Sequence, residues 1–193
     1  MNKQELIGFE EDIKEAFLRG KIRAPVHLSR GNEDTLIEIF KEIKPDDWVF
    51  ATHRSHYHAL LKGIPKEWLR NEILAGRSIH INSAKHKFFT SAIVGGCCPI
   101  ALGLAMAIKR KGLRDKVWVF IGDMAAETGG FHECAKYAMG HNLPMTFVIE
   151  DNEFSVQTPT QEAWGKSTNP IQICRYKYKN EFPHQGVGIY VLF

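Results

Sequence analysis

The sequence of 193 residues lacks several features that would place it quickly in a class. It has no apolar run of the length that a transmembrane helix needs, so we expect no membrane span. Its net charge is only +3, and no block of like charges exceeds three residues, which argues against nucleic-acid binding. Hydrophobic residues make up 44% and charged residues 24%, as in ordinary soluble globular proteins.

Cysteines are few, and their spacing suits neither a metal site nor a disulfide framework. The four lie at positions 97, 98, 134 and 174, an adjacent pair and two distant singles. We therefore expect buried or half-buried thiols in a reducing compartment, which favours the cytoplasm. The N-terminal stretch MNKQELIGFEEDIKEAF is acidic and amphipathic, unlike a signal or transit peptide.

Internal repeats, low-complexity tracts and linker-like stretches are also missing. A chain of 193 residues suffices for one well-buried domain and is short for two, so we expect a single domain over 1–193. It begins with a helical segment, 1–45, in which two helices are predicted. Asn32 is a candidate N-cap of the second helix, and Pro45 follows its end.

The middle of the chain is less regular. Residues 47–77 predict a short strand or turn and then two short helices, divided by Gly63 and Pro65. The stretch SIHINSAKHKFFTSAIVGGCC, 78–98, is rich in small and polar residues and is expected to be irregular. Long irregular loops are uncommon in compact domains, so this one is expected to have a function.

From Pro99 onward the pattern sharpens. PIALGLAMAIKRKG predicts a helix with proline in its first turn and Gly112 at its end. KVWVFIG and PMTFVIE are unbroken apolar runs, typical of strands covered on both faces. Between them an apolar stripe at helical spacing is formed by Phe131, Cys134, Ala135, Ala138 and Met139. A strand, a helix and a strand with short joins predict two adjacent parallel strands, and hence an α/β fold.

A polar side chain follows each of these strands. Asp123 ends the first, and Asn152 ends the second 29 positions later. Ligands of open parallel sheets bind at the carboxyl ends of strands, where these oxygens would converge and would suit Mg²⁺ shared with phosphate oxygens. The intervening AETGG is expected to open the crossover helix, whose N–H groups favour an anion. Helix caps or turn residues are the alternative, and no G-x-G-x-x-G indicates a nicotinamide site.

The stretch GDMAAETGGFHECAKYAMGHNLPMTFVIEDNEF resembles the thiamine-diphosphate motif, which begins Gly-Asp-Gly and ends in Asn about thirty residues later. Its surroundings are similar to the alpha subunit of the thiamine-dependent 2-oxo acid dehydrogenases of the pyruvate, acetoin and branched-chain types. VFATHRSH, RSIH and AIVGGCCPIALGLAMAIK resemble further motifs of that family, in the family's order. The likeness runs from about residue 46 to residue 160.

The resemblance implies a parallel sheet flanked by helices, of the type that binds the diphosphate of thiamine diphosphate, shortened at the C-terminus. It implies that Asp123, Asn152 and the backbone carbonyl of Phe154 hold Mg²⁺. Arg54 would grip the diphosphate bidentately, the alternative being a solvated surface arginine. The other cofactor-binding residues that the resemblance implies are His53, in place of the family's tyrosine, with Ala92, Val94, Met124 and Ala125.

One histidine is a candidate catalytic residue, and the other histidines are not. His80 matches a family histidine that faces the substrate and could donate protons, which makes it the implied catalytic residue; a structural histidine is the alternative. The remaining histidines are expected on the surface or in support of other groups, namely His56, His58, His132 and His184. Glu133, on the crossover helix, is expected at a subunit contact.

Three departures from the family pattern stand out. Met124 replaces the second glycine of Gly-Asp-Gly, which implies a shifted backbone or a thioether against the cofactor. EDN replaces Asn-Asn and adds Asp151, to which the pattern gives no role. The chain ends 41 residues after Asn152 (193 − 152 = 41), and the tail GVGIYVLF is expected to be a last strand against another subunit.

The resemblance further implies a partner. In the family, the glutamate that activates the coenzyme belongs to the pyrimidine-binding domain of a beta subunit. We therefore expect a beta-type chain in a hetero-oligomer such as a heterotetramer, a lipoyl acyl-carrier protein as acceptor, and oxidative decarboxylation of a 2-oxo acid. Two alternatives stay open: half of a split transketolase-like enzyme, or a degenerate, non-catalytic interaction subunit.

Overall fold

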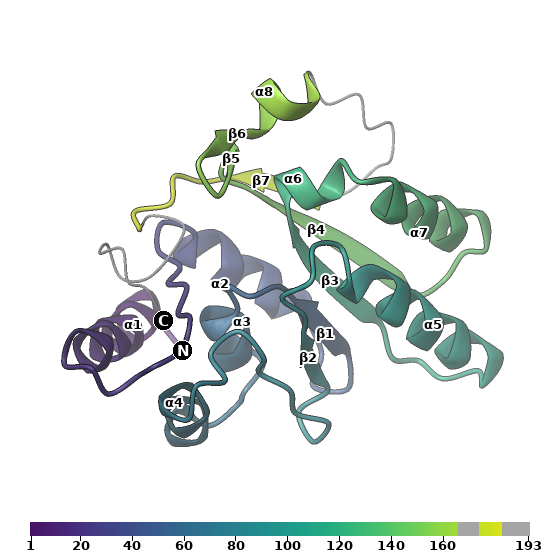
Figure 1. The fold of residues 1–193 in the computed structure, drawn as a ribbon. Coiled ribbons are helices and arrows are strands. Elements are labelled where there is room, and N and C mark those ends of the chain that lie inside the picture. Colours follow the sequence, from purple (N-terminus) through teal and green to yellow (C-terminus); the bar gives the residue numbers. More distant parts are fainter. Residues whose placement is uncertain (166–173, 183–193) are drawn as a thin grey trace.

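The computed structural model describes residues 1–165 and 174–182 (Figure 1). Its helices are α1 Lys3–Leu18, α2 Glu33–Glu42, α3 His56–Leu61, α4 Lys66–Leu74, α5 Cys97–Arg110, α6 Asp123–Ala126, α7 Gly129–Gly140 and α8 Thr160–Trp164. Its strands are β1 Trp48–Ala51, β2 Phe88–Thr90, β3 Val117–Gly122, β4 Met145–Asp151, β5 Phe154–Ser155, β6 Thr158–Pro159 and β7 Cys174–Lys177. The predicted tail strand, 186–193, and His184 lie outside the described residues.

Five strands form one parallel sheet in the order β2-β1-β3-β4-β7. β3 and β4 pair from Val117 opposite Met145 to Gly122 opposite Glu150, so their carboxyl ends lie level. The predicted parallel and adjacent arrangement of these two strands is therefore confirmed. β5 and β6 form a separate antiparallel hairpin just beyond β4.

Helices cover both faces of the sheet (Figure 1). The helices α1 to α4 lie on one side, and their buried side chains form one core cluster with strand residues that include Phe120 and Val148. The helices α5 and α7 pack on the other, against Val119, Ile121 and their neighbours. Successive side chains of β3 thus enter opposite cores, which explains its unbroken apolar sequence. The fold class is α/β, as the sequence predicts.

The strand order contains a switch point. The chain runs from β1 outward to β2, then crosses back over β1 to place β3 on its other side. Loops that leave the carboxyl ends of β1 and β3 therefore diverge, which opens a crevice between them. In open parallel sheets this is where ligands bind.

Two element boundaries differ from the prediction. The stretch 78–98 is not wholly irregular, because Phe88–Thr90 pairs with β1 as the edge strand β2. Its two phenylalanines and threonine suit a strand, but three residues are too few to show a period. The next helix begins at Cys97, two residues before Pro99, which still stands in the first turn.

Two burial predictions also need correction. Met139 is 53% exposed, although the stripe on α7 was expected to bury it. At 3.6 residues per turn it lies about 80° around the helix from Phe131, at the margin of the stripe. Cys174 is exposed on the edge strand β7, whereas the other three cysteines are buried free thiols.

The longest of the described helices, α1, has 16 residues. None of those within 1–165 and 174–182 is long and apolar enough to cross a bilayer.

Candidate functional site

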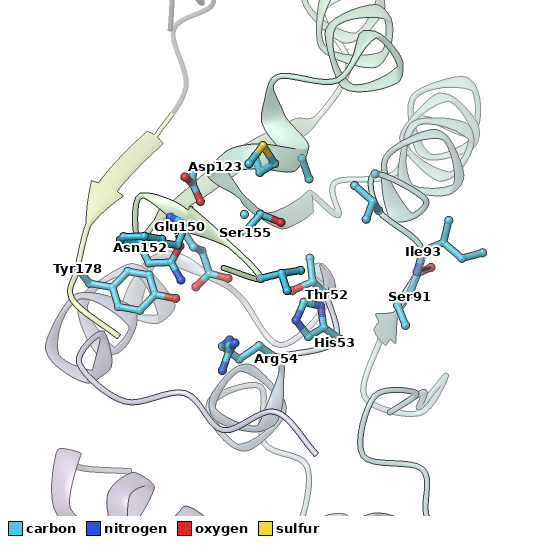
Figure 2. A pocket seen from close by; sticks show the side chains of 18 residues that line it. Thr52, His53, Arg54, Ser91, Ile93, Asp123, Glu150, Asn152, Ser155 and Tyr178 are labelled. Atoms are coloured by element: carbon cyan, nitrogen blue, oxygen red, sulfur yellow. Dashed lines mark hydrogen bonds between the residues drawn. The ribbon is translucent and has the colours of Figure 1, made fainter. Parts of the chain in front are cut away.

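A pocket opens at the carboxyl edge of the sheet, beside the switch point (Figure 2). Segments that follow β1, β2, β3, β4 and β7 all contribute to its wall. Its lining residues are Thr52, His53, Arg54, Ser91, Ala92, Ile93, Val94, Gly95, Gly122, Asp123, Met124, Ala125, Glu150, Asn152, Phe154, Ser155, Val156 and Tyr178. The cavity volume is about 120 Å³, less than the roughly 300 Å³ or more of a pocket that encloses a whole drug-sized ligand.

The residues predicted to bind a cofactor are all among those lining residues. They are His53, Arg54, Ala92, Val94, Asp123, Met124, Ala125, Asn152 and Phe154. The fold therefore brings them together from four separate stretches of the chain. That they bind a cofactor remains a prediction.

His80, the predicted catalytic residue, is placed differently. It is exposed in the turn after α4, where its N–H donates to the Arg77 carbonyl at 3.0 Å, and it does not line this pocket. Its catalytic role remains a prediction. His56 and His58, expected on the surface or in support of other groups, are 0% and 1% exposed and bond to buried carboxyl groups, so the second expectation fits them and the first does not.

Asp123 is a buried carboxyl at the end of β3, 2% exposed. The Thr160 hydroxyl donates a hydrogen bond to its Oδ2. Burial raises the pKa of Asp123, as does the nearby charge of Asp151, while the Thr160 hydroxyl acts in the opposite direction. A buried negative charge beside a second one is electrostatically unfavourable, and a bound cation would relieve it.

Asn152 lies on the loop that joins β4 to the β5–β6 hairpin, and Phe154 is the first residue of β5. The Phe154 N–H donates to Asn152 Oδ1 at 3.1 Å. Phe154 and Pro159 face each other at a non-hydrogen-bonded pair of the hairpin, because the neighbouring pair is bonded from the Thr160 N–H to the Glu153 carbonyl at 2.9 Å, so the Phe154 carbonyl takes no ladder bond from the residue opposite. The carbonyl predicted to bind Mg²⁺ is thus left available by the hairpin pairing.

The same loop carries unusual backbone conformations. Glu153 and Val156 have φ angles of 65° and 57°, in the left-handed region. Val156 is β-branched, so this conformation is strained, and it forms part of the pocket wall. Strain of this kind persists where the surrounding structure enforces it and is frequent at functional sites.

Asp151, to which the sequence pattern gave no role, organises this loop. Its Oδ1 accepts the Glu153 N–H at 3.1 Å, and its Oδ2 pairs with Arg175 Nε at 2.9 Å. The first bond shapes the turn after β4, and the second ties β4 to β7. Asp151 therefore has a structural role that only the tertiary fold reveals.

Met124 stands in α6, a single helical turn that directly follows β3. Its φ is not positive, so the backbone conformation at this position does not require glycine. The crossover helix α7 begins only at Gly129, after α6, and none of the residues 127–130 lines the pocket. AETGG therefore opens the crossover helix as predicted, with Thr128 at its N-cap, but the start of this helix does not line the pocket.

The loop after β2 forms the opposite wall. Gly95 has a φ of 68°, which glycine adopts without cost, and a Cβ on Gly96 would lie 2.9 Å from Ile93 Cβ. The two glycines thus permit a turn that leaves Ile93 and Val94 75% and 72% exposed. Together with the exposed Phe154 and Val156, they give the pocket an apolar rim.

Arg54 enters the pocket wall after β1 and is 9% exposed (Figure 2). Its Nη1 donates to the carbonyl of Leu28. Burial lowers the pKa of Arg54, while Tyr178, Glu10 and Glu150 act in the opposite direction. The surface alternative for this arginine is therefore wrong, because the guanidinium is buried beside anionic groups. His53 packs edge-on against His27, with ring centroids 4.5 Å apart.

Glu150 is a pocket residue that the sequence did not indicate. Its Oε1 contacts His58 Nε2 at 3.2 Å and accepts bonds from the Tyr176 hydroxyl at 2.5 Å and Asn32 Nδ2 at 3.4 Å. Asn32 stands at the N-cap position of α2 as predicted, but its side chain makes no capping bond. It belongs instead to this buried cluster, whose other members come from α3, β4 and β7.

We expect Glu150→Gln to weaken the fold at neutral pH by about 2 kcal/mol, the scale of hydrogen bonds to a charged group. Burial raises the pKa of Glu150, but His58, Tyr176 and Arg54 outweigh it, so the net pKa is lowered. Its stabilising contribution is present above the ordinary glutamate pKa and is lost as pH falls through the folded-state value.

The difference between wild type and Glu150→Gln should therefore shrink below about pH 4. Urea unfolding at several pH values measures it, with Glu38→Gln, an exposed helix residue, as the matched control. A difference that does not change with pH would show that the Glu150 charge does not stabilise the fold.

The donor set of the pocket fits a magnesium-bound diphosphate. It combines one buried carboxylate, an amide oxygen, an available carbonyl and a buried guanidinium, from Asp123, Asn152, Phe154 and Arg54. Hard oxygen donors suit Mg²⁺, and arginine suits phosphate oxygens. Within 1–165 and 174–182 no cluster of three His, Cys, Asp or Glu side chains forms a metal site of another kind.

Fold and pocket together define an α/β protein of the open parallel-sheet class, with a pocket at the switch point. Comparison with known families narrows this class. The model of the dehydrogenase E1 component family matches residues 1–176, and the chain belongs to that family.

Individual relatives agree with this assignment. The chain is 32% identical over 169 residues to the alpha subunit of acetoin:2,6-dichlorophenolindophenol oxidoreductase of Bacillus subtilis (strain 168), covering 82% of this chain and 51% of the relative. It is 31% identical over 166 residues to the pyruvate dehydrogenase E1 component subunit alpha of Porphyra purpurea, covering 77% and 48%. The chain thus spans about half the length of the curated relatives it matches.

Among solved structures, one described as a thiamin diphosphate-dependent enzyme from Mycobacterium smegmatis shows a partial likeness. Its TM-score is 0.44 at 22% sequence identity, with 67% of this chain and 22% of the other covered.

Proposed function

We propose that this chain is the thiamine-diphosphate- and Mg²⁺-binding subunit of a two-chain enzyme that resembles the 2-oxo acid dehydrogenases. The reaction would be the oxidative decarboxylation of a 2-oxo acid. One observation carries the proposal: Asp123, Asn152 and Arg54 line a single pocket at the carboxyl edge of a parallel sheet. Membership of the dehydrogenase E1 component family supports it.

Each of these residues has a distinct task in the proposed site. Asp123, Asn152 and the Phe154 carbonyl would hold Mg²⁺ through oxygen donors. Arg54 would bind the diphosphate, and its burial excludes the water that competes for a phosphate group. When bound, thiamine diphosphate supplies the nucleophilic carbon that breaks the bond beside a carbonyl. The remaining wall, from His53, Ala92, Val94, Met124 and Ala125, would shape the space around it.

A second chain is part of the proposal. A cavity of about 120 Å³ encloses only part of a coenzyme, and the exposed apolar rim around it favours coverage by another protein surface. The relatives are named as alpha subunits, which supports a beta-type partner that brings a pyrimidine-binding domain and its glutamate. The assembly would be a cytoplasmic hetero-oligomer such as a heterotetramer, with a lipoyl protein as acyl acceptor.

Titration calorimetry tests the proposal directly. Thiamine diphosphate is added to this chain with and without its beta-type partner, in Mg²⁺ and in EDTA. We expect Mg²⁺-dependent binding with a Kd in the micromolar range, strengthened by the partner. Absence of binding with both chains present would contradict the proposal and leave the non-catalytic alternative.

An activity assay then separates the two enzymatic alternatives. The two-chain enzyme should decarboxylate a 2-oxo acid in the presence of a dye that accepts electrons. Transfer of a two-carbon unit between sugar phosphates, without decarboxylation, would instead indicate the transketolase-like reaction.

A further inference from the structure

Four buried polar residues, Ser78, His56, Glu10 and Ser29, are joined by hydrogen bonds in the core of the protein. Ser78 Oγ lies 2.9 Å from His56 Nε2, and His56 Nδ1 lies 3.2 Å from Glu10 Oε1. The same Glu10 oxygen accepts the Ser29 N–H at 3.0 Å. All four residues are 0% exposed. Burying this many polar groups costs free energy, because each group loses its contacts with water, so the cluster is expected to have a role.

Serine, histidine and glutamate in this order have the make-up of a hydrolytic triad. The geometry does not permit that function, because no part of Ser78 reaches solvent and a substrate could not approach its hydroxyl. The role of the cluster must therefore be exerted through its neighbours.

The segment Leu28–Ser29, between α1 and α2, connects this cluster to the pocket. Glu10 holds the N–H of Ser29, and the carbonyl of the preceding Leu28 accepts the hydrogen bond from Arg54 Nη1. Glu10 and Arg54 are 44 residues apart in sequence (54 − 10 = 44) but are joined by this short bonded path. The charge of Glu10 also acts on Arg54 directly and favours its charged form.

We propose that Glu10, on a helix that does not line the pocket, is a positioning residue for Arg54. It fixes the Leu28–Ser29 segment, and that segment holds the guanidinium at the pocket wall. A bidentate grip on a diphosphate requires the planar guanidinium to be fixed before binding. This inference rests on the proposed function, since it assigns a support for the phosphate-binding arginine of the same site.

The test compares Glu10→Gln with Glu15→Gln, an exposed substitution on the same helix whose side chain pairs only with Arg19 among the described residues. Glutamine keeps the shape of Glu10, but its neutral amide oxygen accepts a weaker hydrogen bond from the Ser29 N–H than the carboxylate does, and it removes the charge that acts on Arg54. We expect affinity for Mg²⁺–thiamine diphosphate to fall about tenfold in Glu10→Gln, on the scale of second-layer ligand supports. Glu15→Gln should bind as wild type does.

A double-mutant cycle separates positioning from general support of the fold. In an Arg54→Ala background, Glu10→Gln should cause no further loss of affinity, because its effect passes through Arg54. A further loss as large as in the wild-type background would overturn the inference. If wild type binds and Glu10→Gln binds equally well, the inference fails alone; if wild type does not bind, the proposed function fails with it.

A measurement without ligand gives a second readout. The Arg54 Nε–H signal, assigned in ¹⁵N NMR spectra by its loss in Arg54→Lys, reports how firmly the guanidinium is held. Its exchange with solvent should be faster in Glu10→Gln and unchanged in Glu15→Gln. If Glu10→Gln does not fold, Glu10→Asp takes its place, because its shorter side chain withdraws the carboxylate from the Ser29 N–H; unchanged exchange there would overturn the inference.

Discussion

Asp123→Asn is expected to reduce Mg²⁺-dependent thiamine diphosphate binding by at least about 100-fold, equivalent to roughly 3 kcal/mol. The substitution keeps the shape of the side chain and an oxygen that can accept the Thr160 bond. It removes the only full negative charge among the proposed metal ligands. In a buried site the attraction between a carboxylate and a divalent cation is much stronger than in water, so its loss is large.

The same variant should make the chain without ligand more stable. Burial and Asp151 raise the pKa of Asp123, so the charged form is less favourable in the folded chain than in the unfolded chain. At neutral pH this charge costs stability, and a neutral isostere removes the cost. A gain in thermal stability together with a loss of binding is the signature of a residue kept for its ligand.

Calorimetry and thermal unfolding in EDTA measure the two effects. Asp46→Asn is the matched control, since that carboxylate is 87% exposed and should affect neither quantity. Binding by Asp123→Asn as tight as that of wild type would show that Asp123 is not a metal ligand. If Asp123→Asn is less stable than wild type in EDTA, Asp123 would instead have a structural role, through its hydrogen bond with Thr160.

The central part of the fold could be predicted from the sequence because its signals are local. Two unbroken apolar runs with a helical stripe between them predict β3, α7 and β4 and their parallel pairing. The pocket residues followed from motifs of a known family, which carry spatial information that spacing alone lacks. Edge strand β2 was missed because three residues show no periodicity.

Long-range polar contacts could not be predicted in the same way. Glu150 meets Asn32 and His58 across 118 and 92 positions in the sequence. Nothing in the local pattern around Asn32 distinguishes a side chain that caps its own helix from one that turns into a buried cluster. For the same reason Arg54 could be predicted at the pocket, but its hold on the Leu28 carbonyl could not.

Phe120→Ala is expected to lower the free energy of unfolding by about 4 kcal/mol, within the range for buried phenylalanines. The ring is 0% exposed on the central strand β3. It stacks on Phe40 with centroids 5.4 Å apart and meets the edge of His58 at 4.6 Å. Alanine would leave a cavity among rings that the sheet behind them prevents from closing.

For a chain of this size such a loss should lower Tm by about 12 °C. Thermal unfolding measures it, with Met139→Ala as the control, because that side chain is 53% exposed and should contribute little. Below the new Tm, ligand affinity should be nearly unchanged, since Phe120 points into the core and does not line the pocket. A fall in stability of less than about 1 kcal/mol would show that the core relaxes around the site, contrary to the close packing found here.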